Sequence, residues 1–255
     1  MRHGWITSPS VRLLDYISGW ETANSSSDPT NDIDFGAGVC WINDHLVESS
    51  SIITKRLDAA WQAGNNQGGS VVGSKANSTW YHCFAMFNPS TGAIDACFDT
   101  SVTGTNAPSG WVVRRVWSVQ TRSDGSIRPY TQTGDRCTWR DSTFYSSTGA
   151  IGNTARILIV LTVPTGIQVE PLIVIFYSGS NADYLWCTSP QNQNDGQADY
   201  TIGQIHVQCS SVAPLGTVRL LTDTSGRIGV REALGNANNS LWISCAGYID
   251  ARGKR

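Results

Sequence analysis

The sequence is short of charged side chains. They make up 15% of its 255 residues, with 18 lysines and arginines against 20 aspartates and glutamates, whereas soluble domains usually carry about 25%. The formal net charge is −2, and tight basic clusters are few, notably Arg114-Arg115 and the tail from Arg252 to Arg255. Because nucleic-acid binding usually needs a basic patch that releases counterions, we expect no nucleic-acid partner.

Long apolar runs are also missing. The longest, residues 157–163, is interrupted by Thr162 and has the length of a strand, whereas a membrane-spanning helix needs about 18 apolar residues or more. The N-terminal residues Met1 to Trp5 are not followed by the apolar stretch of a signal peptide. We therefore expect no membrane insertion.

Paired cysteines are absent, although seven cysteines are present. They are widely spaced and odd in number, and none forms a CxxC pair of the kind that metal sites and redox motifs use. A chain of this length folds without disulfides or a metal. We expect all seven to be buried thiols, namely Cys40, Cys83, Cys97, Cys137, Cys187, Cys209 and Cys245.

Catalytic and cofactor motifs are missing too. The sequence contains no HExxH, no GxSxG, no Walker motif and no GxGxxG after a predicted strand, so we predict no catalytic residues, no metal and no cofactor. His82 lies mid-strand beside aromatic residues, where a structural histidine is expected. A triad assembled from distant residues stays open, as does a glycosidase pair drawn from Asp183, Asp195 and Asp199.

The sequence does contain patterns that are typical of β-strands and the turns between them. Alternating apolar residues and turns rich in glycine, asparagine and serine predict an all-β fold of two β-sandwich or jelly-roll-like lobes. One short α-helix is predicted at about 51–62, where Ile53, Leu57, Ala60 and Trp61 share a helical face. The predicted units are an N-terminal attachment segment at 1–30 and β-sandwich domains at 31–145 and 154–255, divided by the small-residue stretch near residue 150.

Two hairpins are predicted within this pattern. Asp124-Gly125 separates strand-like runs at 111–121 and 127–132, and both residues tolerate the positive φ of a tight turn. Thr165-Gly166 separates 156–163 from 167–177. This second pair is nearly continuous in isoleucine, leucine and valine, which predicts strands buried on both faces.

Aromatic residues are well supplied, with ten tryptophans and eight tyrosines. Aromatic faces stack on sugar rings, while asparagine and aspartate side chains bind hydroxyl groups. A predicted loop combines both types, so it is our candidate site for a glycan or receptor: Asn181, Asp183, Tyr184, Trp186, Asn192 and Asp195. The alternative is that Tyr184 and Trp186 pack into the core, as large aromatic residues usually do.

Several phrases of the sequence, in order, resemble those of a family of phage tail-fibre-like structural proteins. They cover residues 31–140 densely and the remainder thinly. The phrases are TNDIDFGAG at 30–38, TKRLDAAW at 54–61, NQGG at 66–69, ANSTWYH at 76–82, STGAID at 90–95, FDTS at 98–101, YTQTGD at 130–135 and VPTGI at 163–167. The chain departs from the family in Cys83, Trp111, Cys137 and residues 181–200, so the resemblance does not extend to the candidate glycan loop.

The resemblance implies a virion protein assembled in the cytoplasm of the phage's host. It implies a tail-fibre or baseplate-peripheral subunit that contacts other virion proteins, forms a homotrimer and contributes to host attachment. A cell-surface glycan is the receptor expected from the aromatic, asparagine and aspartate residues of the candidate loop. Two alternatives stay open: a head-fibre, decoration or connector protein that binds no ligand, and a glycan-modifying hydrolase.

Overall fold

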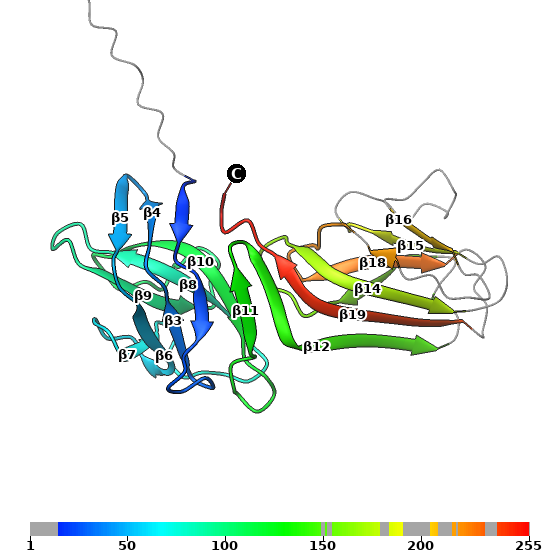
Figure 1. Ribbon diagram of the computed structural model, residues 1–255, viewed down its shortest axis with the longest axis horizontal. Helices are drawn as coiled ribbons and strands as arrows, with labels where there is room; N and C mark the ends of the chain where they lie inside the picture. The colour runs from blue at the N-terminus through cyan, green and yellow to red at the C-terminus, as the bar shows by residue number, and fades with distance from the viewer. Residues whose placement is uncertain are drawn as a thin grey trace, which may run out of the picture.

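The computed structural model describes residues 15–148, 151, 155–178, 184–190, 205–208, 216–217, 219–232 and 239–254. Every regular element in these ranges is a β-strand, and Figure 1 shows them gathered in two lobes that lie side by side. The predicted all-β fold is therefore confirmed.

The first lobe contains a seven-stranded sheet and a three-stranded sheet. Strands of the larger sheet follow the order β10-β8-β9-β7-β6-β3-β2 and those of the smaller the order β1-β4-β5. All pairings are antiparallel except β6 with β7 and β7 with β9. The bounds are β1 (Ile17–Gly19), β2 (Thr22–Asn24), β3 (Asp32–Phe35), β4 (Gly38–Ile42), β5 (His45–Ser49), β6 (Ile53–Ala60), β7 (Gln67–Ser70), β8 (Trp80–Phe87), β9 (Ile94–Asp99) and β10 (Val112–Gln120).

The second lobe contains a five-stranded sheet, β11-β12-β19-β14-β17, and a four-stranded sheet, β13-β18-β15-β16. Side chains of β14 alternate between buried and exposed, and apolar residues of both sheets belong to one core. This is the arrangement of a β-sandwich. The bounds are β11 (Tyr130–Thr133), β12 (Arg136–Thr148), β13 (Ile157–Val160), β14 (Glu170–Ser178), β15 (Tyr184–Thr188), β16 (Ile205–Gln208), β17 (Gly216–Thr217), β18 (Arg227–Glu232) and β19 (Ser240–Ile249).

The helix predicted at 51–62 is wrong, because this segment forms strand β6. Ile53, Lys55 and Leu57 are buried on one face of the strand, while Arg56 and Asp58 are exposed. A spacing of four residues, as between Ile53 and Leu57, fits a strand as well as a helix. Buried and exposed residues alternate along β6, but the buried position 55 is a lysine and not an apolar residue. The alternation of a strand is therefore not visible in the sequence.

The second predicted hairpin is also wrong. Strand β13 pairs with β18, while β14 pairs with β19 and β17, so the two runs belong to different sheets. Each strand is buried on one face only, since Val160 and Val174 are exposed. The continuous apolar sequence therefore reflects an apolar outer surface and not burial on both faces.

The Asp124-Gly125 turn of the first predicted hairpin is confirmed. Gly125 has a φ of 83°, and the Arg122 amide donates to the Ser126 carbonyl at 2.8 Å. The pairing stops at the single bridge between Thr121 and Ile127, after which the chain enters the second lobe's sheet. Strands β11 and β12 thus join the second lobe, although the predicted first domain extended to residue 145. The division into separate domains stays a prediction.

Five aromatic rings join the two lobes, and we call them the junction cluster. Trp117 stacks on Tyr248 with ring centroids 5.6 Å apart and on Tyr130 at 6.4 Å, while Trp80 and Trp139 pack around them. The Tyr248 hydroxyl donates to the Ser118 carbonyl at 3.0 Å. Since Trp80 and Trp117 come from the first lobe and the three other rings from the second, the lobes share a core.

Candidate functional site

The predicted glycan site is described only in part. Asn181, Asp183, Asn192 and Asp195 lie outside the described residues. Tyr184 and Trp186 belong to strand β15, and the Trp186 side chain is buried with 4% of its surface exposed. Trp186 therefore packs in the core here, which is the alternative that the sequence left open for it. Glycan binding by the loop stays a prediction.

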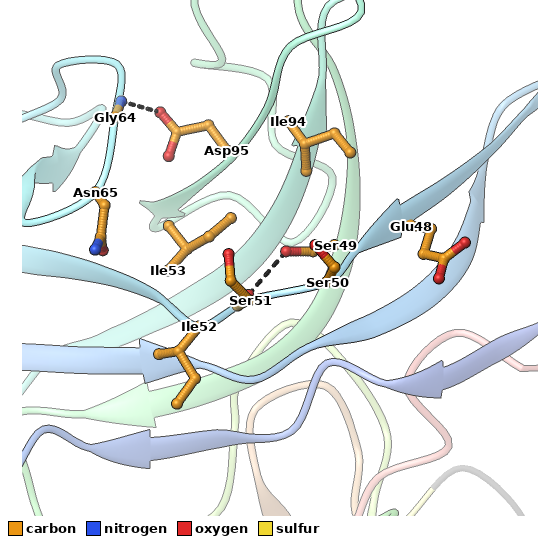
Figure 2. A pocket seen from close by; sticks show the side chains of 10 residues that line it. All are labelled: Glu48, Ser49, Ser50, Ser51, Ile52, Ile53, Gly64, Asn65, Ile94 and Asp95. Atoms are coloured by element: carbon orange, nitrogen blue, oxygen red, sulfur yellow. Dashed lines mark hydrogen bonds between the residues drawn. The ribbon is translucent and has the colours of Figure 1, made fainter.

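A serine-lined pocket of about 320 Å³ opens on the first lobe (Figure 2). Residues 48–53 form one wall, and Gly64, Asn65, Ile94 and Asp95 complete it. The Ser49 hydroxyl donates to the Ser51 carbonyl at 2.9 Å. The Asn65 side-chain carbonyl accepts the Thr54 amide at 2.7 Å. The hydroxyl of Ser49 is thus engaged with a carbonyl, and the described residues offer it no hydrogen bond to a base that would activate it as a nucleophile.

A buried ion pair adjoins the serine-lined pocket through Asp95. The Lys55 Nζ is 3.1 Å from Asp95 Oδ1 and donates to the carbonyls of Gln62 at 2.7 Å and Gly64 at 3.1 Å. Figure 2 shows the Asp95 carboxylate also accepting the Gly64 amide, at 3.1 Å. Burial lowers the pKa of Lys55, and the neighbouring carboxylate opposes this shift. The Asp95 carboxylate therefore fixes the 62–64 loop through its bonds to Lys55 and to the Gly64 amide.

A second cavity, the arginine pocket, measures about 390 Å³ and lies where the C-terminal tail meets the first lobe. The tail follows β19 back to the junction (Figure 1). A shift of register between Arg115 and Trp117 interrupts β10, and the Val116 carbonyl at this bulge accepts Arg252 Nε at 3.0 Å. The residues that line the arginine pocket are Trp41, Asn43, Val102, Val113, Arg114, Arg115, Arg252 and Gly253.

The three guanidinium groups of the arginine pocket have different partners. Arg115 forms a two-bonded ion pair with Asp250, at 2.6 and 2.8 Å. Burial alone would raise the pKa of Asp250, but the hydrogen bonds and charge of Arg115 hold it below its usual value. Arg114 donates to the carbonyls of Asp15 and Trp41. Sequence reasoning noted both basic clusters without a signal that they converge.

His82 and Ser118 form a buried pair in the first lobe. His82 Nδ1 lies 2.9 Å from the Ser118 hydroxyl, and both side chains are buried. Burial, and secondarily the positive charge of Arg115, lowers the pKa of His82 to about 4. A neutral histidine enclosed in this way has no access to a substrate, so its role is structural, as the sequence indicated.

The stability of the protein should fall as the pH drops from 6.5 to about 4. In this window the unfolded state binds a proton at His82, whose usual pKa is 6.5, while the folded state holds the ring neutral down to about 4. The difference amounts to about 3 kcal/mol of lost unfolding free energy by pH 4. Urea unfolding at a series of pH values measures it, with His82→Asn, which does not titrate, as the control. An equal slope in the two proteins between pH 6.5 and 4 would contradict this assignment.

The described cysteines are buried thiols. Cys40, Cys83, Cys97, Cys137, Cys187 and Cys245 are free, and Cys209 lies outside the described residues. Burial raises the pKa of Cys40 and Cys245 to about 11 and that of Cys187 to about 12. Such thiols stay protonated and unreactive at neutral pH. Within the described ranges no group of three or more histidine, cysteine, aspartate or glutamate side chains could hold a metal ion.

No helix in the described part of the chain has the length and apolar character needed to cross a membrane. Comparison with protein-family models, with curated protein sequences and with solved structures gave no match.

Proposed function

We propose that the chain is a structural subunit of a bacteriophage particle, of the tail-fibre or baseplate-peripheral kind, and that it contributes to host attachment. The observation that carries the proposal is the ordered set of phrases between residues 30 and 140 that resembles phage tail-fibre-like proteins. Six of these phrases overlap β3, β6, β7, β8 and β9, which belong to one sheet. The resemblance therefore falls on the framework of a folded lobe.

The junction between the lobes supports a mechanical role. A fibre or baseplate subunit must transmit force between the particle and the host without bending at a loose linker. Here the aromatic junction cluster and the buried Arg115–Asp250 pair connect the lobes. Buried, well-packed contacts of this kind resist relative motion more than a polar linker does.

Localisation on the particle tests the proposal. An antibody raised against the purified chain should label the tail or baseplate of the phage that encodes it, and density for the two lobes should appear there in a cryo-EM map. Purified chain should also adsorb to host cells and slow phage adsorption. Absence of the chain from purified particles would overturn the virion role.

The same experiments, together with an assay of polysaccharide hydrolysis, distinguish the proposed function from its two alternatives. A chain located on the head, or one on the tail that does not adsorb to cells, would favour a decoration or connector protein. Release of reducing sugar or acetate from host envelope polysaccharide would favour the hydrolase. Our proposal requires that the chain adsorb to host cells and release neither reducing sugar nor acetate.

We propose further that the subunit forms a homotrimer. An apolar face lies on the outside of the five-stranded sheet, where Phe144 is 76% exposed beside partly exposed Val174, Phe176 and Trp242. Trp242 pairs with Phe176 across the strands, with ring centroids 4.9 Å apart. Exposed apolar patches of this kind mark subunit contacts, and closed rings suit a symmetric particle.

Light scattering coupled to size exclusion should give three times the chain mass of 27.6 kDa. Phe144→Asp places a charge on the apolar face and should shift the protein towards monomer. Leu46→Asp, at an exposed leucine of the first lobe, should leave the trimer intact. A wild-type monomer at high micromolar concentration would contradict the trimer.

A further inference from the structure

The arginine pocket brings together two basic clusters that are far apart in the sequence. Arg114 and Arg115 lie on β10, whereas Arg252 belongs to the tail that follows β19. Arg252 and Gly253 both have positive φ angles, 56° and 74°, so the tail turns sharply where it meets β10. Arg252 fixes this turn through bonds to carbonyl oxygens of the first lobe, including Gly19 at 2.6 Å.

The guanidinium group of Arg252 has no carboxylate among the hydrogen-bond acceptors that the described residues offer it. Arg252 is 2% exposed, and within the described part of the chain its guanidinium group donates to carbonyl oxygens only, while its backbone amide donates to Asp250 Oδ1 at 2.8 Å. Burial lowers the pKa of Arg252, against the opposing charges of Asp135, Glu21 and Asp250. None of these carboxylates lines the cavity, and among the described lining residues the charged groups are all arginines. A buried guanidinium group whose hydrogen bonds go to neutral carbonyls favours an anion nearby.

The lining of the pocket also includes groups suited to a sugar ring. Trp41 is half-buried, and its indole N–H has no acceptor among the described residues. Asn43 is exposed at a turn with a φ of 51°. An aromatic face stacks on the apolar side of a pyranose, while the indole N–H and the amide bind hydroxyl groups. The volume of about 390 Å³ lies within the range of small-molecule sites.

We propose that the arginine pocket binds an acidic sugar, a pyranose that carries a carboxylate, as part of a host surface polysaccharide. Guanidinium groups recognise the carboxylate, Trp41 stacks on the ring and Asn43 binds a hydroxyl group. None of the lining residues that the structure describes belongs to the segment 181–195. This inference rests on the proposed function because it supplies the ligand class for host attachment.

Titration calorimetry with two acidic and two neutral sugars tests the inference. Trigalacturonate and 3′-sialyllactose are the acidic probes, and galactotriose and lactose are the neutral ones. At least one acidic probe should bind about tenfold or more tighter than its neutral counterpart, and raising the salt from about 50 to 300 mM should weaken its binding.

Two variants locate the site. Trp41→Ala should lower the affinity about tenfold or more by removing the stacking face. Asn43→Gly keeps the positive φ of the turn and removes the amide, so it should weaken binding without unfolding the protein. Trp242→Ala, on the second lobe, is the matched control and should bind like the wild type.

The inference is overturned if neither acidic probe binds at about 10 mM, if neutral sugars bind equally well, or if Trp41→Ala binds normally. It is also overturned if a single-stranded oligonucleotide binds tighter than both acidic sugars and loses affinity in Trp41→Ala, since the pocket would then serve nucleic acid. A chain located on the virion that binds no acidic sugar defeats this inference alone. A chain that binds an acidic sugar but is absent from particles defeats the proposed function alone.

Discussion

Asp95→Asn should lower the free energy of unfolding by about 3–5 kcal/mol. The substitution keeps the shape of the side chain but leaves the ammonium group of Lys55 buried without its counter-charge. The Gly64 amide also loses a charged acceptor, so the 62–64 loop should loosen with the core. Removal of one partner costs more than the pair contributes, because the remaining charge stays desolvated.

Urea unfolding at pH 7, followed by tryptophan fluorescence, measures this effect. The double variant Lys55→Met with Asp95→Leu should recover part of the loss, because it leaves no unpaired charge. Arg219→Gln breaks an ion pair with Glu170 in which the Arg219 side chain is 82% exposed, and should change stability little. Equal effects of Asp95→Asn and Arg219→Gln would show that the Lys55–Asp95 pair is not buried in solution.

Trp117→Ala should lower the free energy of unfolding by a similar amount, about 3–5 kcal/mol. Trp117 is 0% exposed and stacks between Tyr130 and Tyr248, both of which come from the second lobe. Its loss leaves a cavity where the lobes share their core. We expect the wild type to melt in one calorimetric transition and the variant to melt in two, because the coupling between the lobes is weakened.

Two substitutions control for this result. Trp242→Ala removes the same side chain from a site where it is 37% exposed in the single chain. When both tryptophan variants are compared in the Phe144→Asp background, in which the proposed subunit contact is broken, Trp242→Ala should cost less, because little new cavity forms. Tyr248→Phe keeps the ring and removes only the hydroxyl that donates to the Ser118 carbonyl, which should cost about 1 kcal/mol. A Trp117→Ala protein as stable as Trp242→Ala would contradict the shared core.

The burial of Lys55 shows where local pattern misleads. Strand β6 contains TKRLDAA, in which charges at three of seven positions suggest a solvated helix face. Only the tertiary structure supplies the Asp95 carboxylate, from β9, and the two carbonyls that make a buried lysine tolerable. A residue whose partner is 40 positions away cannot be assigned a face from its neighbours alone.

The candidate sites show the same division. Trp186 lies in a segment whose composition suggests a glycan-binding loop, but its side chain is buried in β15. Trp41 drew no attention in the sequence, because one tryptophan in an ordinary strand has no motif around it. The side chains that make the arginine pocket come from β4, the turn after it, the loop after β9, β10 and the C-terminal tail. Such a set is recognisable only once the strands are placed.

The sequence by itself determined the strand-rich class, the Asp124-Gly125 turn and the burial of the described cysteines. Each depends on interactions between near neighbours or on the chemistry of a single residue type, which composition and spacing record directly. The tertiary structure decided which strands pair, that β13 and β14 belong to different sheets, and that Arg115 meets Asp250. These features depend on long-range burial and charge pairing, whose free energy exists only when distant segments come together.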